Sequence, residues 1–104
     1  MIDREAIRDF CQELVEAFHP QKVVLFGSYA YGTPDDGSDV DLLVVMPISE
    51  APARVSAEIL MALAPSFPVD VLVRSPEQLA LRLKAGDEFL REIMQKGIML
   101  HDVA

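Results

Sequence analysis

The 104-residue sequence has one cysteine, no tryptophan, few basic residues and no long apolar run. The single cysteine, Cys11, excludes an intramolecular disulfide and any metal site built from several cysteines. No apolar segment approaches the ~20 residues that a membrane-spanning helix needs. The 9 basic and 17 acidic residues give a net charge of −8, which would repel a nucleic-acid backbone. We therefore expect neither direct nucleic-acid binding nor membrane insertion.

Length and composition predict a single domain over residues 1–104, large enough for a modest core. Hydrophobic residues make up 51% of the chain, which favours a partner or self-association that covers some apolar surface. The N-terminal segment MIDREAIRDF is charged and lacks the features of a signal peptide, so we expect a cytoplasmic protein. Cys11 falls on the apolar face of a predicted helix, where packing in the core is expected.

Apolar residues at three- and four-residue spacings predict helices over residues 4–18 and 51–64. The short apolar runs KVVLFG, DVDLLVVM and VDVLV predict three strands, bounded by glycine, proline and aspartate. Ser75, a following proline and Gln78 indicate a capped helix start, and one or two further helices extend to about residue 95. The final IMLH segment is a short apolar tail.

The order of these elements, α-β-turn-β-α-β-α, predicts an α/β fold with a small mixed sheet flanked by helices. A whole helix connects the second and third strands, so these two are expected to be parallel. The first and second strands are joined by a short connection, which favours an antiparallel pair.

Three aspartates lie where predicted strands begin. Asp39 and Asp41 open the second strand and, being two residues apart, are expected to share one face. Asp70 occupies the corresponding position of the third strand. With the predicted strand directions, all three lie at one edge of the sheet, which is also the edge where the first strand ends at Gly27 and Ser28. We expect the three carboxylates to converge there.

Like charges this close repel, and burying an unpaired carboxylate costs several kcal/mol. A divalent cation removes both penalties, and carboxylate oxygens are suitable ligands for Mg²⁺, which also binds substrate phosphates. The spacing therefore predicts a Mg²⁺ site, with Gly27 and Ser28 placed to bind a phosphate. Two structural alternatives remain open: Asp39 caps a turn, or Asp70 pairs with an arginine such as Arg74.

The stretch Gly27-Ser28, ten further residues and Asp39-Val40-Asp41 resembles the signature of the polymerase-β-like nucleotidyltransferase superfamily. The size of the chain, its third acid and its tail are most similar to the minimal nucleotidyltransferases (MNT proteins), and the resemblance covers essentially the whole chain. Members are commonly antitoxins encoded beside a HEPN-domain RNase toxin. The resemblance implies Mg²⁺-dependent transfer of AMP from ATP to a tyrosine of that toxin.

Carried over by position, the resemblance implies that Asp39 and Asp41 hold the metals, two ions being expected. Asp70 completes the site and helps activate the acceptor hydroxyl, and Gly27 with Ser28 holds the triphosphate. Assembly with the toxin, or of several copies, is also implied.

The chain departs from the family pattern in one respect. Many relatives carry an arginine after Gly-Ser, where this chain has Tyr29 and Tyr31, which we interpret as packing and solvent-edge residues. Three basic residues elsewhere in the chain are possible substitutes for this arginine: Lys22, Arg54 and Arg74. The two histidines, His19 and His101, are expected at the surface.

We consider three hypotheses, in order of preference. The first is a nucleotidyltransferase that modifies a partner protein. The second is a non-catalytic antitoxin that neutralises its partner by contact alone. The third is transfer to a small molecule or an RNA end, which the short chain and its negative charge disfavour.

Overall fold

The computed structural model describes residues 1–103, which contain five helices and four strands. The helices are α1 (Arg4–Phe18), α2 (Ser28–Tyr31), α3 (Pro52–Leu63), α4 (Pro76–Lys84) and α5 (Glu88–Lys96). The strands are β1 (Lys22–Phe26), β2 (Val40–Val45), β3 (Val69–Arg74) and β4 (Ile98–Asp102).

The four strands form one mixed sheet in the order β3-β2-β1-β4. β1 is antiparallel to β2, and β2 is parallel to β3, as the connection lengths predict. The predicted α/β class with a small mixed sheet is confirmed. The tail IMLH is not a loose segment: it forms β4, which pairs antiparallel with the other edge of β1. The sequence pattern missed β4 because its pairing depends on a strand more than 70 residues earlier.

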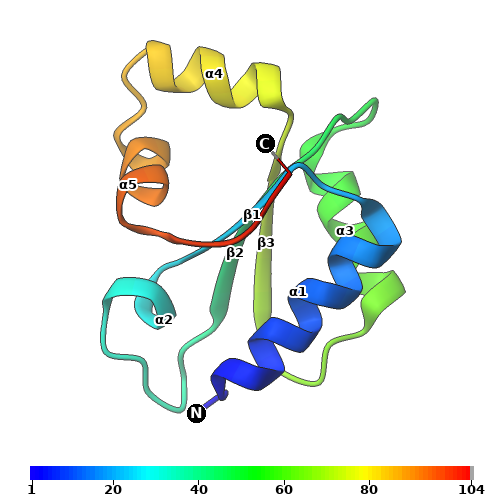
Figure 1. Cartoon of the computed structure of the whole chain (residues 1–104), viewed down its shortest axis with the longest axis vertical. Coiled ribbons are helices and arrows are strands. Elements are labelled where there is room, and N and C mark those ends of the chain that lie inside the picture. The colour runs from blue at the N-terminus through cyan, green and yellow to red at the C-terminus, as the bar shows by residue number, and fades with distance from the viewer. Residues whose placement is uncertain (104) are drawn as a thin grey trace.

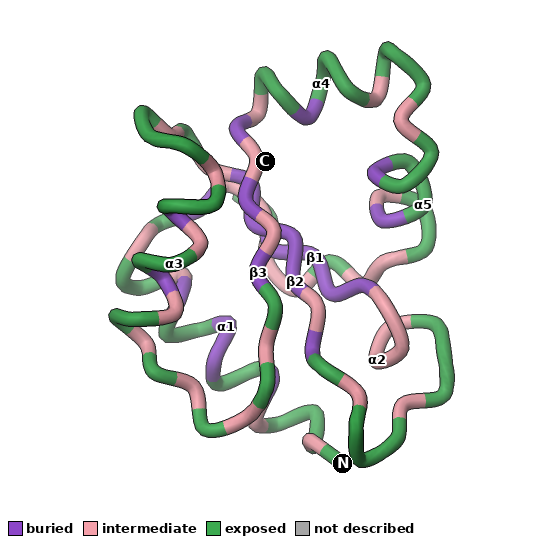
Figure 2. Tube along the Cα trace, turned by 180° about the vertical axis from the view of Figure 1, so that it is seen from behind, coloured by how far each residue is buried: buried purple, intermediate pink, exposed green. Residues whose placement is uncertain are grey.

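Helices cover both faces of the sheet (Figure 1). α1 and α3 pack on one face, against alternate residues of β2 such as Leu42 and Val44. α4 and α5 pack on the other face, against Leu43 and Val45. All four side chains are at most 1% exposed, and the buried residues follow the strands through the middle of the molecule (Figure 2). A strand buried on both faces is a near-continuous apolar run, as β2 is.

Local capping explains where the helices begin. The Asp3 carboxylate accepts a hydrogen bond from the Ala6 N–H at 2.9 Å and starts α1. The predicted cap of α4 is confirmed: Ser75 and Gln78 form a reciprocal capping box, with both hydrogen bonds at 3.0 Å. Cys11 is buried in the core, as predicted, and burial raises the pKa of its thiol to about 11. Within residues 1–103, no helix has the length and apolarity to cross a membrane.

Candidate active site

Strand register brings two of the predicted acids together. Asp41 is the second residue of β2 and lies directly beside Asp70 of β3 and beside Phe26, the last residue of β1. Neighbouring strands are about 4.8 Å apart, so the two carboxylates are neighbours. Both belong to the side-chain rows that face α4 and α5, because Leu43 and Leu72, two residues further along, pack on that side. Asp39 precedes β2 by one residue and is exposed.

The three acids repel one another. Partial burial raises the pKa of Asp41 above its ordinary value, and the negative charges of Asp70 and then Asp39 raise it further. No side-chain hydrogen bond or ion pair found within residues 1–103 involves any of these carboxylates. The cluster is therefore an uncompensated concentration of negative charge at the end of the sheet where β1 ends and β2 and β3 begin.

Neither structural alternative for these acids is realised. The turn before β2 is closed by Asp35, whose carboxylate accepts hydrogen bonds from the Gly37 N–H and the Ser38 hydroxyl, so Asp39 does not cap it. The Arg74 guanidinium donates to the Val73 carbonyl at 2.7 Å and does not pair with Asp70. Residues four apart in a strand are separated by about 13 Å, which explains why that ion pair does not form.

Gly27 connects the Gly-Ser pair to the carboxylates. It directly follows β1 with a φ of +75°, a conformation that favours glycine. A Cβ atom at this position would overlap Oδ2 of Asp41 and lie 3.1 Å from its Cγ. The glycine backbone thus lies against the Asp41 carboxylate, and Ser28 begins the short helix α2 beside it. The fold therefore places the two halves of the sequence signature next to each other.

The donor chemistry of this edge fits Mg²⁺, because all three acids supply hard carboxylate oxygens. As the side chains stand, no three Asp, Glu, His or Cys residues within residues 1–103 surround a single point. Asp39 and Asp70 are exposed, whereas Asp41 is partly buried. Asp39, Asp41 and Asp70 are the candidate ligands at this end of the sheet.

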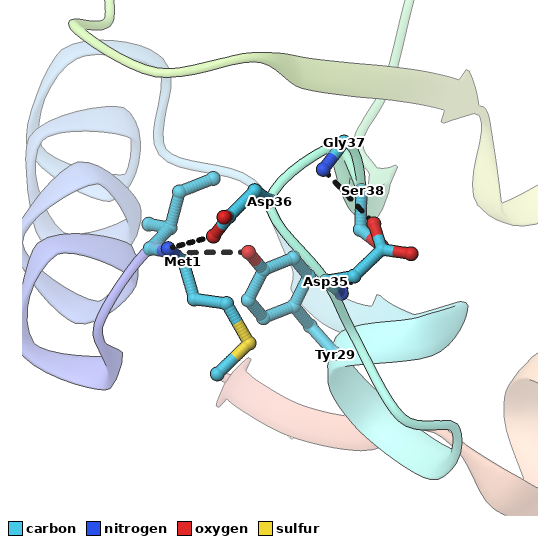
Figure 3. Close-up of polar contacts among 7 residues, drawn as sticks. Met1, Tyr29, Asp35, Asp36, Gly37 and Ser38 are labelled. Carbon is cyan, nitrogen blue, oxygen red and sulfur yellow. Dashed lines mark hydrogen bonds and ion pairs between the residues drawn. The ribbon is translucent and has the colours of Figure 1, made fainter.

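The residues after Gly-Ser do not supply a cation. Tyr29 packs against the core, and its hydroxyl accepts a hydrogen bond from the Ile2 N–H at 3.0 Å (Figure 3). The amino group of Met1 pairs with Asp36 at 3.0 Å, so the N-terminus is joined to the loop that precedes β2 (Figure 3). Tyr31 is 43% exposed. These positions agree with the packing and solvent-edge interpretation of the two tyrosines.

The suggested substitute cations lie elsewhere. Lys22 is at the far end of β1 and pairs with Asp102 at 3.0 Å, while Arg54 of α3 pairs with Glu50 at 2.9 Å. Of the two histidines, His19 is exposed at the end of α1, as predicted. His101 is partly buried within β4 because it pairs with β1, so the expectation of a surface position is only partly met.

An aromatic pair beside the acids was not predicted. Phe26, the neighbour of Asp41, contacts Phe89 of α5 edge to face, with ring centroids 5.8 Å apart. The Phe89 side chain remains 55% exposed. In the sequence, Phe89 has only the pattern of an amphipathic helix, so nothing there indicates its place near the carboxylates. The pair forms an apolar wall on the face of the sheet that carries Asp41 and Asp70.

Solved structures share this fold at low sequence identity. A Sulfolobus solfataricus protein described as a nucleotidyltransferase superposes with a TM-score of 0.62 and 20% identity, over 91% of this chain and 76% of that one. A toxin–antitoxin structure with AMP-PNP gives 0.58 and 20%, over 92% and 73% of the two chains. A mutant of the toxin–antitoxin pair MntA-HpeT gives 0.57 and 19%, over the same shares.

Comparison by sequence assigns the family. No curated protein sequence is significantly similar to the chain. The model of the nucleotidyltransferase domain family matches residues 4–100, which include all the described strands and helices except the last two residues of β4. The chain therefore belongs to the nucleotidyltransferase domain family.

Proposed function

We propose that the protein is a Mg²⁺-dependent nucleotidyltransferase that transfers AMP from ATP to a tyrosine hydroxyl of a partner protein. The observation that carries this proposal is the contact between Gly27 and the Asp41 carboxylate, at the edge where Asp39 and Asp70 also lie. Membership of the nucleotidyltransferase domain family supports the reaction class. The proposed role is that of an antitoxin, and the proposed partner is a HEPN-domain RNase toxin.

Each site residue has a proposed part in the reaction. Gly27 lets the triphosphate approach the backbone, and the Ser28 hydroxyl donates to a phosphate oxygen. Asp39, Asp41 and Asp70 hold the cation. Bound Mg²⁺ would stabilise the negative charge of the triphosphate and of the departing pyrophosphate.

The proposed chemistry takes place at the α-phosphorus of ATP. The tyrosine oxygen forms a bond to this phosphorus, and the bond from phosphorus to the oxygen bridging the α- and β-phosphates breaks. Pyrophosphate leaves, and the phenolic proton passes to the Asp70 carboxylate, which is exposed at the edge of the site. The product is a tyrosine that carries AMP on its phenolic oxygen.

Two observations support a protein partner. Two of the structures with the same fold are toxin–antitoxin structures, and one of these was obtained with AMP-PNP. Several large apolar side chains are exposed on the surface of this chain, among them Met61 at 82% and Leu81 at 68%. We propose that the protein forms a complex with the toxin in the cytoplasm.

A second candidate function is neutralisation of the toxin by contact alone. It is favoured by the charges around the site, since no Lys or Arg is paired with Asp39, Asp41 or Asp70 within residues 1–103. A cation in this place would bind phosphate oxygens. In this case the site residues could be exchanged without loss of neutralisation.

The deciding experiment uses ATP labelled at either the α- or the γ-phosphate, with Mg²⁺ and the product of the neighbouring gene. We expect label from the α-phosphate to appear on the partner and to disappear with Asp39→Asn plus Asp41→Asn. A matched control, Asp9→Asn plus Glu13→Gln, removes two exposed charges from α1 and should leave transfer intact. Tight binding with no transfer of either label would favour the contact-only antitoxin.

A further inference from the structure

The outer edge of β3 borders a groove of about 700 Å³ between α3 and α4. β3 is an edge strand, since the sheet order places only β2 beside it. The groove is lined by residues 71–74 of β3 and by side chains of the two helices: Pro52, Ala53 and Ser56 from α3, and Gln78, Leu81 and Arg82 from α4. It does not include Asp39, Asp41 or Asp70, so it is separate from the carboxylate cluster.

The backbone of β3 offers only donors to this groove. The even-numbered residues face β2, as the hydrogen bonds from Val40 N–H to Pro68 O and from Met46 N–H to Arg74 O show. The odd-numbered residues therefore face outward. The outward carbonyl of Val71 accepts from the Ser56 hydroxyl.

The outward carbonyl of Val73 is likewise occupied, because it accepts from the Arg74 guanidinium at 2.7 Å. The outward N–H groups of Val71 and Val73 have no acceptor in the described part of the chain. An edge strand with free N–H groups is a template for pairing with another chain.

The side chains of the groove are complementary to an acidic ligand. Arg74, Gln78 and Arg82 line it, and no acidic residue of the described range 1–103 does, although the whole chain carries a net charge of −8. Arg82 has one distant ion pair, with Asp87 at 3.7 Å. The opposite wall, from α3, consists of Pro52, Ala53 and Ser56, and the Ser56 hydroxyl is already bonded to the Val71 carbonyl.

We propose that this groove binds an extended segment of a partner protein in which acidic and apolar side chains alternate. The segment lies along β3, and its carbonyls accept hydrogen bonds from the N–H groups of Val71 and Val73. Side chains of an added strand alternate between the two faces of the sheet. Acidic ones therefore meet Arg74 and Arg82 on the α4 side, and apolar ones meet the α3 wall.

The groove also lies close to the candidate active site. The side chains of Asp70, Leu72 and Arg74 lie on one face of β3. Leu72 and Arg74 line the groove, and Asp70 is the residue that precedes them on this face. Binding in the groove does not depend on the proposed AMP transfer, and each is tested without the other.

The test uses the full chain and two synthetic octapeptides, one of alternating Glu and Val and one of alternating Lys and Val. Affinity is measured by titration calorimetry, and binding is mapped by amide NMR. We expect the Glu–Val peptide to bind and to shift the amide resonances of Val71 and Val73. Arg74→Gln plus Arg82→Gln should weaken it about tenfold. The matched control, Arg91→Gln plus Lys96→Gln on α5, removes the same charge outside the groove and should bind normally.

The net charge of −8 favours the Lys–Val peptide everywhere on the surface, so a preference for Glu–Val has to come from the groove. Equal binding of both peptides, or unchanged affinity of the Arg74→Gln plus Arg82→Gln variant, would overturn the proposal. So would a concentration-dependent dimer of the free protein whose formation shifts the same two amides, because a second copy would then occupy the groove.

Discussion

The two ends of β2 differ in what they contribute to the molecule. From Leu42 onward, the strand is fully buried between two layers of helices. At its head, Asp41 is partly buried next to two further carboxylates, and burial and repulsion both raise its pKa. The interior stabilises the fold, whereas the head weakens it. The comparison teaches that the apolar part of the strand holds together charges that would separate if they were free, as is common at functional sites.

The largest expected effect is on the head of the strand. Asp39→Asn plus Asp41→Asn should reduce AMP transfer by at least about 10³-fold, because the carboxylates that hold the cation are lost. Thermal unfolding of this variant should not occur at a lower temperature than that of the wild type, since like charges are removed. If this variant were less stable than the wild type, the result would contradict the claim that the charges at the head of β2 weaken the fold.

The second effect concerns the interior. Leu42→Ala should lower the free energy of unfolding by about 2–5 kcal/mol, because Leu42 is 0% exposed and its removal leaves a cavity. Urea unfolding measures the loss. Met61→Ala is the control, since Met61 is 82% exposed, and it should change stability by no more than about 0.5 kcal/mol.

A third, smaller effect concerns Gly27, whose backbone lies against the Asp41 carboxylate at the head of β2. Gly27→Ala should cost about 1–3 kcal/mol, because a φ of +75° with a ψ of −158° is a conformation that essentially only glycine adopts, and more because the new Cβ displaces the Asp41 carboxylate. Gly86→Ala is a matched control: its φ is +89°, but a Cβ there meets nothing within 4 Å. Urea unfolding of both variants compares a positive-φ glycine that contacts Asp41 with one that has open space around it. Equal destabilisation would show that this contact is unimportant.

The smallest effect is a pH dependence of stability. Because the pKa of Asp41 is raised in the folded state, the folded protein binds its proton at a higher pH than the unfolded chain does. Above this raised pKa, the ionised Asp41 carboxylate therefore lowers the free energy of unfolding. The lost stability is recovered as the pH falls through the raised pKa and below the pKa that Asp41 has in the unfolded chain. Asp41→Asn should raise the melting temperature at pH 7, and the gain should disappear at acidic pH. A gain that persists at low pH would contradict this explanation.

Much of the architecture was predictable from local patterns. Helix α1, three strands and the capping box of α4 follow from periodicity and from residues such as Ser75 and Gln78. Strand β4 could not be predicted in this way, because its five residues have a weak apolar pattern and become a strand only through pairing with β1. Long-range pairing of this kind has no local signal.

The candidate site was predictable in its main features and not in its surroundings. The alignment of Asp41 with Asp70 follows from strand direction, whereas the closeness of Gly27 to Asp41 depends on the backbone turn after β1. The aromatic wall of Phe26 and Phe89, and the groove along β3, depend on how helices pack on the sheet. Residues that contact one another only in the folded chain leave no pattern in the sequence.

The most direct test is to locate a bound cation, using paramagnetic Mn²⁺ in place of Mg²⁺ and measuring the broadening of amide NMR resonances. We predict broadening around Gly27, Ser28, Asp41 and Asp70, and its loss in the Asp39→Asn plus Asp41→Asn variant. Broadening centred instead on the exposed acids Asp35 and Asp36, or unchanged in that variant, would contradict a cation site at the head of β2.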